Sequence, residues 1–214
     1  MTYKDLNTKG KIEHIWIYYK LHIFMVIFLI GLLVSLIYTI FIKPHPNLYC
    51  GVAMYDQFLS TQDTEKLTSE LNSKFNLDHK EYSIDVQSFY SDSNDVMVEA
   101  ELNQKFNTYI YNSQFHLLMS DKEKIQMFID AEYMTPLSDY LSQEQIAKLD
   151  KKGKIMYAND PYSKENKPMA INISNSALLK KYNLYQDKGC YVGFVPMLDN
   201  EDRTLNVLNA FLEE

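Results

Sequence analysis

The chain has few of the residues on which small scaffolds and enzyme sites commonly depend. It contains two Cys, six Gly and one Trp among 214 residues. Two Cys are too few for a disulfide framework or a four-Cys zinc site. Six Gly leave little material for a phosphate-binding loop, and the motifs H-E-x-x-H, C-x-x-C and G-x-S-x-G do not occur. These absences predict a protein that is not an enzyme and that uses no cofactor and no metal.

Positive charge is also scarce. The chain has 21 Lys and Arg against 28 Asp and Glu, a formal net charge of −7. Because a surface that binds nucleic acid is normally basic, we expect no nucleic-acid partner. The apolar share of 46% and the 17 Tyr are typical of a folded chain and not of a disordered one.

Charged residues are absent from one long stretch, the 22 residues LHIFMVIFLIGLLVSLIYTIFI between Lys20 and Lys43. A helix of that length rises about 33 Å at 1.5 Å per residue, enough to cross a hydrocarbon layer of about 30 Å. A cleaved signal peptide fits less well, because its apolar core is usually shorter and a pair of small residues precedes the cleavage site. We therefore expect an uncleaved transmembrane helix at residues 21–43.

The lysines around this stretch predict its orientation. Lys4, Lys9, Lys11 and Lys20 precede it, whereas only Lys43 follows it closely. The positive-inside rule then places residues 1–20 in the cytoplasm and residues 44–214 outside, in a single-pass protein of the cell membrane. The outer domain has 16 basic and 26 acidic residues, a net charge of −10.

The amino-terminal residues 1–20 form a lead-in to this span. Ile12, Ile15, Trp16 and Tyr19 recur at helical spacing. That spacing fits an interfacial helix at the membrane surface and equally a continuation of the membrane helix into the cytoplasm.

Residues 44–214 alternate between apolar runs and amphipathic stretches. Extended segments are predicted at residues 48–54, 82–89, 115–119, 133–137, 169–173 and 191–195. Helices are predicted at residues 63–75, 95–109, 121–129, 142–149, 176–182 and 201–212. Residues 148–154 and 160–167 are interpreted as a charged turn and a polar loop. This alternating order predicts an α/β domain with a mostly parallel central sheet.

Several segments resemble known families. The run FHLLM at residues 115–119, Asp121 and the stretch MTPLSDYL at residues 134–141 resemble extracellular solute-binding proteins of the type 2 periplasmic-binding-protein-like superfamily. The strand at residues 191–196 and the final helix are similar to the end of those proteins. Residues 15–20 are similar to short membrane-anchored proteins of low-GC Gram-positive bacteria. The resemblance implies a reduced, membrane-tethered binding module with a solute-binding-protein-like fold.

Such a module would capture a small solute or a peptide. In open α/β sheets, ligands bind beyond the carboxyl ends of the strands. The residues that follow the predicted strands there, and thus the candidate ligand-binding residues, are Tyr55, Asp56, Tyr90, Asp121, Asn172 and Ser174. Aromatic rings would form an apolar wall, and the carboxylates would hold a cationic or hydroxyl-bearing ligand.

Two alternatives stay open for these residues. The Asp side chains also fit the plainer role of capping the helices that follow them. The same surface would equally serve a non-enzymatic partner or scaffold subunit of a cell-envelope complex, which docks a protein and not a solute.

The remaining Cys and His residues give no further site. Cys50 and Cys190 both belong to the outer domain, where a disulfide and two buried free thiols fit the sequence equally well. His116 lies inside the apolar run FHLLM and is interpreted as an ordinary strand residue, and His79 has no ligand motif around it.

Overall fold

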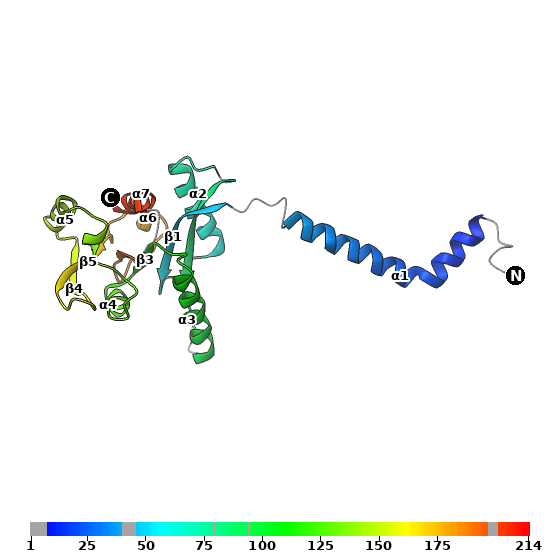
Figure 1. The fold of residues 1–214 in the computed structure, drawn as a ribbon, viewed down its shortest axis with the longest axis horizontal. Helices are drawn as coiled ribbons and strands as arrows, with labels where there is room; N and C mark the ends of the chain where they lie inside the picture. The colour runs from blue at the N-terminus through cyan, green and yellow to red at the C-terminus, as the bar shows by residue number, and fades with distance from the viewer. Residues whose placement is uncertain (1–7, 40–45, 79, 94, 197–200) are drawn as a thin grey trace. The chain divides into compact units, whose positions relative to one another are not determined.

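A computed structural model describes residues 8–39, 46–78, 80–93, 95–196 and 201–214 (Figure 1). The chain divides into two compact units, residues 1–45 and residues 46–214, each with its own internal contacts. The two units are described separately.

The first unit is built on one helix, α1 (Thr8–Ile37). Its segment Tyr19–Ile37 has 19 residues with a mean hydropathy of 2.5, and none of it is buried. It is long and apolar enough to cross a membrane, a property that a signal helix near the amino terminus shares. Because α1 continues from Thr8 without a break, the lead-in is the first part of the same helix.

The second unit contains a six-stranded sheet within the described residues. The strands are β1 (Asn47–Tyr55), β2 (Tyr82–Phe89), β3 (Leu117–Ser120), β4 (Ile155–Asn159), β5 (Asn166–Asn172) and β6 (Tyr191–Phe194). Their order across the sheet is β2-β1-β3-β6-β5-β4. β1 pairs in parallel with β2 and β3, whereas the pairs β3–β6, β6–β5 and β5–β4 are antiparallel.

The prediction of an α/β domain is confirmed, but the mostly parallel sheet is wrong. Residues 155–159, for which no strand is predicted, form β4 and pair with β5 across the polar loop as a hairpin. β6 then returns between β3 and β5 in the opposite direction. The predicted extended segment at residues 133–137 contributes only an isolated bridge from Thr135 to Phe194. Strand direction depends on these non-local pairings, which a local alternation of apolar and polar residues does not encode.

Helices connect the strands, and several begin at a side chain that caps them. They are α2 (Thr61–Lys74), α3 (Val96–Tyr111), α4 (Lys122–Asp130), the 3₁₀-helix η3 (Leu137–Asp139), α5 (Gln143–Asp150), α6 (Ala177–Lys181) and α7 (Glu201–Leu212). Ser60, Asp95, Asp121 and Ser142 accept a hydrogen bond from a backbone N–H in the first turn of α2, α3, α4 and α5. Such caps stabilise a helix by about 1 kcal/mol each.

The central strands are buried on both faces, so the domain has two apolar cores. Cys50, Val52 and Met54 of β1 belong to a first core, which also contains residues of α2, α6 and α7. Ala53 of β1 belongs to a second core with Phe106 of α3 and residues of α4. Helices therefore cover both faces of the sheet, as strands without a polar face require.

Gly51 lies where β1 approaches the segment before β3 most closely. A Cβ at this position would overlap the backbone carbonyl group of Gln114. At Gly193 the nearest atom to such a Cβ is the terminal methyl group of Met134, which is flexible. The carbonyl oxygen of Met169 lies 2.9 Å from the same Cβ, so backbone obstructs both positions, with the larger overlap at Gly51.

We expect Gly51→Ala to lower the free energy of unfolding by about 3 kcal/mol, the upper part of the range for overpacking. Gly193→Ala should cost less, because the nearest backbone atom to its Cβ, the carbonyl oxygen of Met169, is 2.9 Å away, whereas the overlap with backbone at Gly51 is larger. Gly153→Ala is the control without a steric obstacle, and its positive φ should cost about 1 kcal/mol. Urea unfolding of the three variants measures this order, and a Gly51→Ala protein as stable as wild type would contradict the described approach of the two strands.

Candidate functional site

The predicted site residues lie at one edge of the sheet. β1, β2 and β3 run in parallel, so their carboxyl ends share an edge, here called the carboxyl edge. β6 is antiparallel to β3, and β5 is antiparallel to β6. β5 therefore runs in the same direction as β3 and also ends at this edge. Tyr55, Asp56, Tyr90, Asp121 and the pair Asn172 and Ser174 all follow or end these strands.

The strand order 2-1-3 makes a topological switch point at the carboxyl ends of β1 and β3. The connection through α2 adds β2 on one side of β1, and the connection through α3 adds β3 on the other. Open α/β sheets bind ligands in the crevice that such a reversal creates. The side chains at this crevice therefore decide what the edge can bind.

In this chain, the side chain of Tyr185 occupies the switch point. Its hydroxyl oxygen lies 2.9 Å from the carbonyl oxygen of Tyr55 and 3.0 Å from that of Met119. The hydroxyl of Ser120 donates to the same Tyr55 carbonyl at 2.9 Å. Burial raises the pKa of Tyr185 well above its usual value, with smaller contributions from Cys190, Asp56 and Asp121. The phenol therefore keeps its proton and remains a donor to the two strand ends.

Tyr55 faces the second core and not an open cleft. Its ring packs edge-on against Phe106 and Phe128, with ring centroids 5.2 and 4.9 Å away. Its hydroxyl donates to Oδ1 of Asn103 at 2.9 Å. Burial raises its pKa, helped by the charges of Asp56 and Glu99. Tyr55 thus joins β1 to α3 and α4.

The two carboxylates of the predicted site have internal partners. Asp56, which has a φ of +57°, forms an ion pair with Lys188 at 2.8 Å. That hydrogen bond raises the pKa of Lys188. Asp121 accepts from the backbone N–H of Lys124 at 2.9 Å and so caps α4. For Asp121 the alternative of a capping residue is therefore the observed role.

Asn172 and Ser174 close a local turn. Oδ1 of Asn172 accepts from the backbone N–H and the hydroxyl of Ser174, at 3.0 and 2.7 Å. The hydroxyl of Ser174 in turn accepts from the backbone N–H of Cys190 at 2.9 Å. These bonds join the end of β5 to the start of β6 and leave the polar atoms partnered within the fold.

Tyr90 is the predicted site residue that is most open to solvent. Its ring contacts that of Phe58, with centroids 5.8 Å apart, and both side chains are exposed. Phe58, Tyr185 and Lys188 belong to this edge but were not predicted from the sequence. They lie in connecting segments without apolar periodicity, where a single aromatic or basic residue gives no signal.

Next to this edge, the start of α3 extends into solvent. Residues 96–101 are all exposed, and Figure 1 shows α3 projecting from the rest of the domain. Val96 and Met97 are 76% and 71% exposed. Residues 91–101, here called the acidic tip, have the sequence SDSNDVMVEAE, with four carboxylates and no Lys, Arg or His. The acidic tip thus combines exposed apolar side chains with charge of one sign.

The other candidate residues have structural surroundings. His116 is buried, and its Nδ1 accepts from the backbone N–H of Gly51 at 2.9 Å. Burial lowers its pKa, so the ring stays neutral near pH 7. Cys50 and Cys190 are buried free thiols, and burial raises the pKa of Cys50 to about 12. His79 lies outside the described residues, which contain no cluster of three His, Cys, Asp or Glu suited to a metal.

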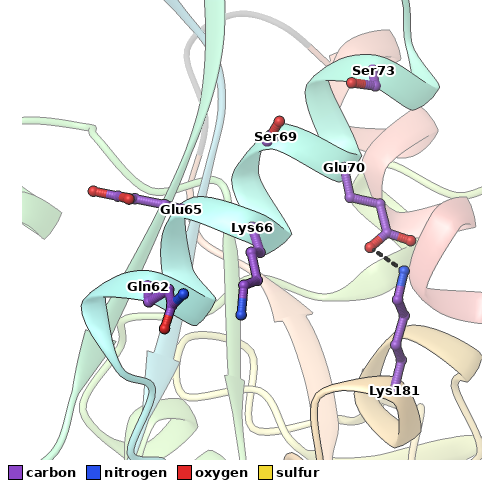
Figure 2. Close-up of a pocket in the computed structure, with 7 residues that line it drawn as sticks. All are labelled: Gln62, Glu65, Lys66, Ser69, Glu70, Ser73 and Lys181. Carbon is purple, nitrogen blue, oxygen red and sulfur yellow. Dashed lines mark hydrogen bonds and ion pairs between the residues drawn. The ribbon is translucent and has the colours of Figure 1, made fainter.

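A hollow of about 690 Å³ lies over the exposed face of α2 (Figure 2). Its lining is polar and consists of Gln62, Glu65, Lys66, Ser69, Glu70, Ser73 and Lys181. Glu70 forms an ion pair with Lys181 at 2.6 Å and accepts from the hydroxyl of Tyr182 at 2.8 Å. These contacts join α2 to α6, and all the residues that line the hollow are of polar or charged types.

No protein family, curated protein or solved structure matches this chain. The resemblance to solute-binding proteins stays a prediction.

We expect Tyr185→Phe to lower the free energy of unfolding by about 1–2 kcal/mol, because it removes a buried donor from two strand-end carbonyls. Tyr182→Phe is the matched control, since its hydroxyl bonds to the partly exposed Glu70 and should contribute less. Urea unfolding of the full chain measures both. Equal losses for the two variants would contradict the anchoring role of the Tyr185 hydroxyl.

Proposed function

We propose that this chain is a single-pass protein of the cell membrane whose outer domain docks a protein partner through the acidic tip of α3. The domain acts as a non-enzymatic partner subunit of a cell-envelope complex. The observation that carries the proposal is the exposure of Val96 and Met97 on a helix that projects from the domain.

The exposure of Val96 and Met97 to water is unfavourable and needs an explanation. Each side chain would gain about 1.5–3 kcal/mol by full burial, and here both stand at the first turn of one helix. Phe58 and Tyr90 add two exposed rings at the same edge of the sheet. Grouped exposed apolar side chains with a polar rim are typical of interaction surfaces.

The charge of the acidic tip restricts the partner. Asp92, Asp95, Glu99 and Glu101 surround the apolar pair without a cation among residues 91–101. Electrostatic complementarity therefore favours a partner surface that combines Lys or Arg with apolar side chains. An anionic lipid surface would repel these carboxylates. The partner is therefore a protein and not the bilayer.

Capture of a small solute at the switch point is the weaker interpretation. Tyr185 occupies that position, and Asp56 and Asp121 are engaged by Lys188 and by the first turn of α4. A solute would have to displace a buried aromatic side chain together with its hydrogen bonds. The acidic tip needs no such rearrangement.

The membrane topology rests on the sequence. The uncharged span and the lysines before it support an amino terminus in the cytoplasm and a domain outside the cell. The domain then has the acidic net charge and the patterned cores of a water-exposed module.

For the topology, we expect a membrane-impermeant maleimide on intact cells to label a Glu144→Cys variant and not a Lys4→Cys variant. Glu144 is exposed on α5, and the two native thiols are buried, so the introduced thiol is the reactive group. Labelling of both variants after the cells are opened is the control. Labelling of Lys4→Cys on intact cells would reverse the assignment.

For the docking surface, the probe is an amphipathic peptide of Leu and Lys, titrated against the full chain in zwitterionic nanodiscs. We expect Met97→Ser to weaken binding about tenfold, the typical effect of truncating an interface anchor. Glu99→Gln with Glu101→Gln should weaken binding at low salt and make it less sensitive to salt. Fluorescence anisotropy of the labelled peptide measures both effects.

Tyr111→Ser is the matched control, because Tyr111 is 80% exposed at the other end of α3. A peptide of Leu and Glu is the control for charge. Docking at the acidic tip would be excluded by equal losses for Met97→Ser and Tyr111→Ser, or by equal binding of the two peptides.

A further inference from the structure

A cavity of about 270 Å³ lies between α5 and α7. Its lining residues are Leu141, Gln145, Lys148, Leu149, Lys152, Lys154, Leu208, Asn209 and Leu212. We infer that this cavity, here called the lysine cavity, receives the acidic tip of a second copy of the same chain. The inference rests on the proposed docking role of the tip and names its partner.

The floor of the lysine cavity is apolar. Leu141 and Leu208 are buried members of the first core, and Leu149 and Leu212 pack partly buried against it. An apolar side chain that enters from outside would therefore extend an existing core. The volume of the lysine cavity lies just below the range of about 300–1,000 Å³ for small-molecule pockets. A cavity of this size can take one or two side chains of the size of Val96 and Met97.

The rim of the lysine cavity is basic. Three Lys and no Asp or Glu line it. Lys154, with its side chain 15% exposed, is neutralised by Glu214 at 2.6 Å. Lys148 and Lys152 have no carboxylate within 4.0 Å among the described residues. Lys154 and, more weakly, Lys152 lower the pKa of Glu214, so Lys148 is the lining cation that is left for the charge of a partner among the described residues.

The two surfaces complement each other in charge and polarity. The acidic tip presents exposed Val96 and Met97 among four carboxylates, and the lysine cavity presents an apolar floor lined by three lysines. This lysine cavity is basic within a domain whose net charge is −10. The lysine cavity therefore combines Lys with apolar side chains, as the proposed partner surface of the acidic tip should.

The two surfaces lie too far apart within one chain to meet each other. The tip follows β2 and the cavity precedes β4, which are the two outer strands of the sheet. Figure 1 shows α3 and α5 at opposite ends of the domain. The contact is therefore head-to-tail between copies, a geometry that produces rings or open chains and not only dimers.

The small contact area is compatible with an assembly confined to a membrane. One helix end in one cavity buries less than a typical stable interface. A membrane anchor raises the effective concentration of the copies, so a weak contact suffices there.

The experiment uses pairs of introduced thiols in the full chain. Ala100→Cys and Asn209→Cys, both at exposed positions, are combined in one chain, and membranes are treated with a short bismaleimide. The native thiols are buried and do not take part. We expect a ladder of dimers, trimers and larger species from the double variant, and no ladder from either single variant. Tyr111→Cys with Asn209→Cys is the matched control and should give no ladder.

Charge exchange tests the specificity of the contact. Lys148→Glu with Lys152→Glu should lower the crosslinked fraction about tenfold, because carboxylates then face carboxylates. Adding Glu99→Lys and Glu101→Lys to the same chain should restore it. Lys151→Glu, next to the lysine cavity but not part of its lining, should have little effect.

The outcomes separate the two proposals. Absence of a ladder, or a ladder that charge exchange leaves unchanged, overturns the contact between copies. If the Leu and Lys peptide still binds the tip in that case, the docking role stands and the partner is another basic protein. If Met97→Ser lowers neither peptide binding nor the crosslinked fraction of the double-Cys chain, both proposals fail.

Discussion

The hydroxyl of Tyr185 determines what the central part of this domain can bind. Buried carbonyl groups at the ends of parallel strands need partners, and open α/β folds leave a crevice at that point. Here a side chain of the same chain donates to the carbonyls of Tyr55 and Met119. Tyr185 reaches them with a φ of +53°, a left-handed conformation that costs a non-glycine residue about 1 kcal/mol. The ion pair of Lys188 with Asp56 holds the same loop to β1. Side chains of the same chain therefore occupy the switch point between the ends of β1 and β3.

Local signals in the sequence were sufficient for most of the helices and for the central strands. The capping residues and apolar stripes of α2, α3 and α5 predict these helices to within two residues at each end. β4 was missed because its residues IMYAN do not alternate between apolar and polar types and stand beside a charged turn, although their side chains alternate in burial. The direction of β6 was missed for a different reason. It follows from pairings between segments far apart in the chain, for which no local pattern exists.

For the candidate site, too, the local sequence predicts where the residues lie but not which distant residues they contact. The topology places Asp56, Tyr55 and Asp121 at one edge, as their positions after parallel strands predict. Their roles could not be predicted, since a carboxylate after a strand fits a helix cap and a ligand contact equally well. Asp121 caps α4, and the partner of Asp56 is Lys188, 132 residues away. Tyr185 gives no signal either, because it follows a short helix in a segment without periodicity.

Requirements of stability account for some charges at the two exposed surfaces and not for others. Lys154 neutralises Glu214, and Asp95 caps α3, so the fold itself explains both. The fold gives no such reason for Val96 and Met97, which leave two apolar side chains in water at the first turn of a helix. Nor does it require three Lys and no Asp or Glu around one apolar cavity, although Lys154 and, more weakly, Lys152 interact with Glu214 and Lys148 lies in the last turn of α5. Exposed apolar groups and clustered like charges both carry a cost that selection for stability alone would remove. Their presence at two complementary places supports the proposed interaction between proteins over the proposed capture of a solute.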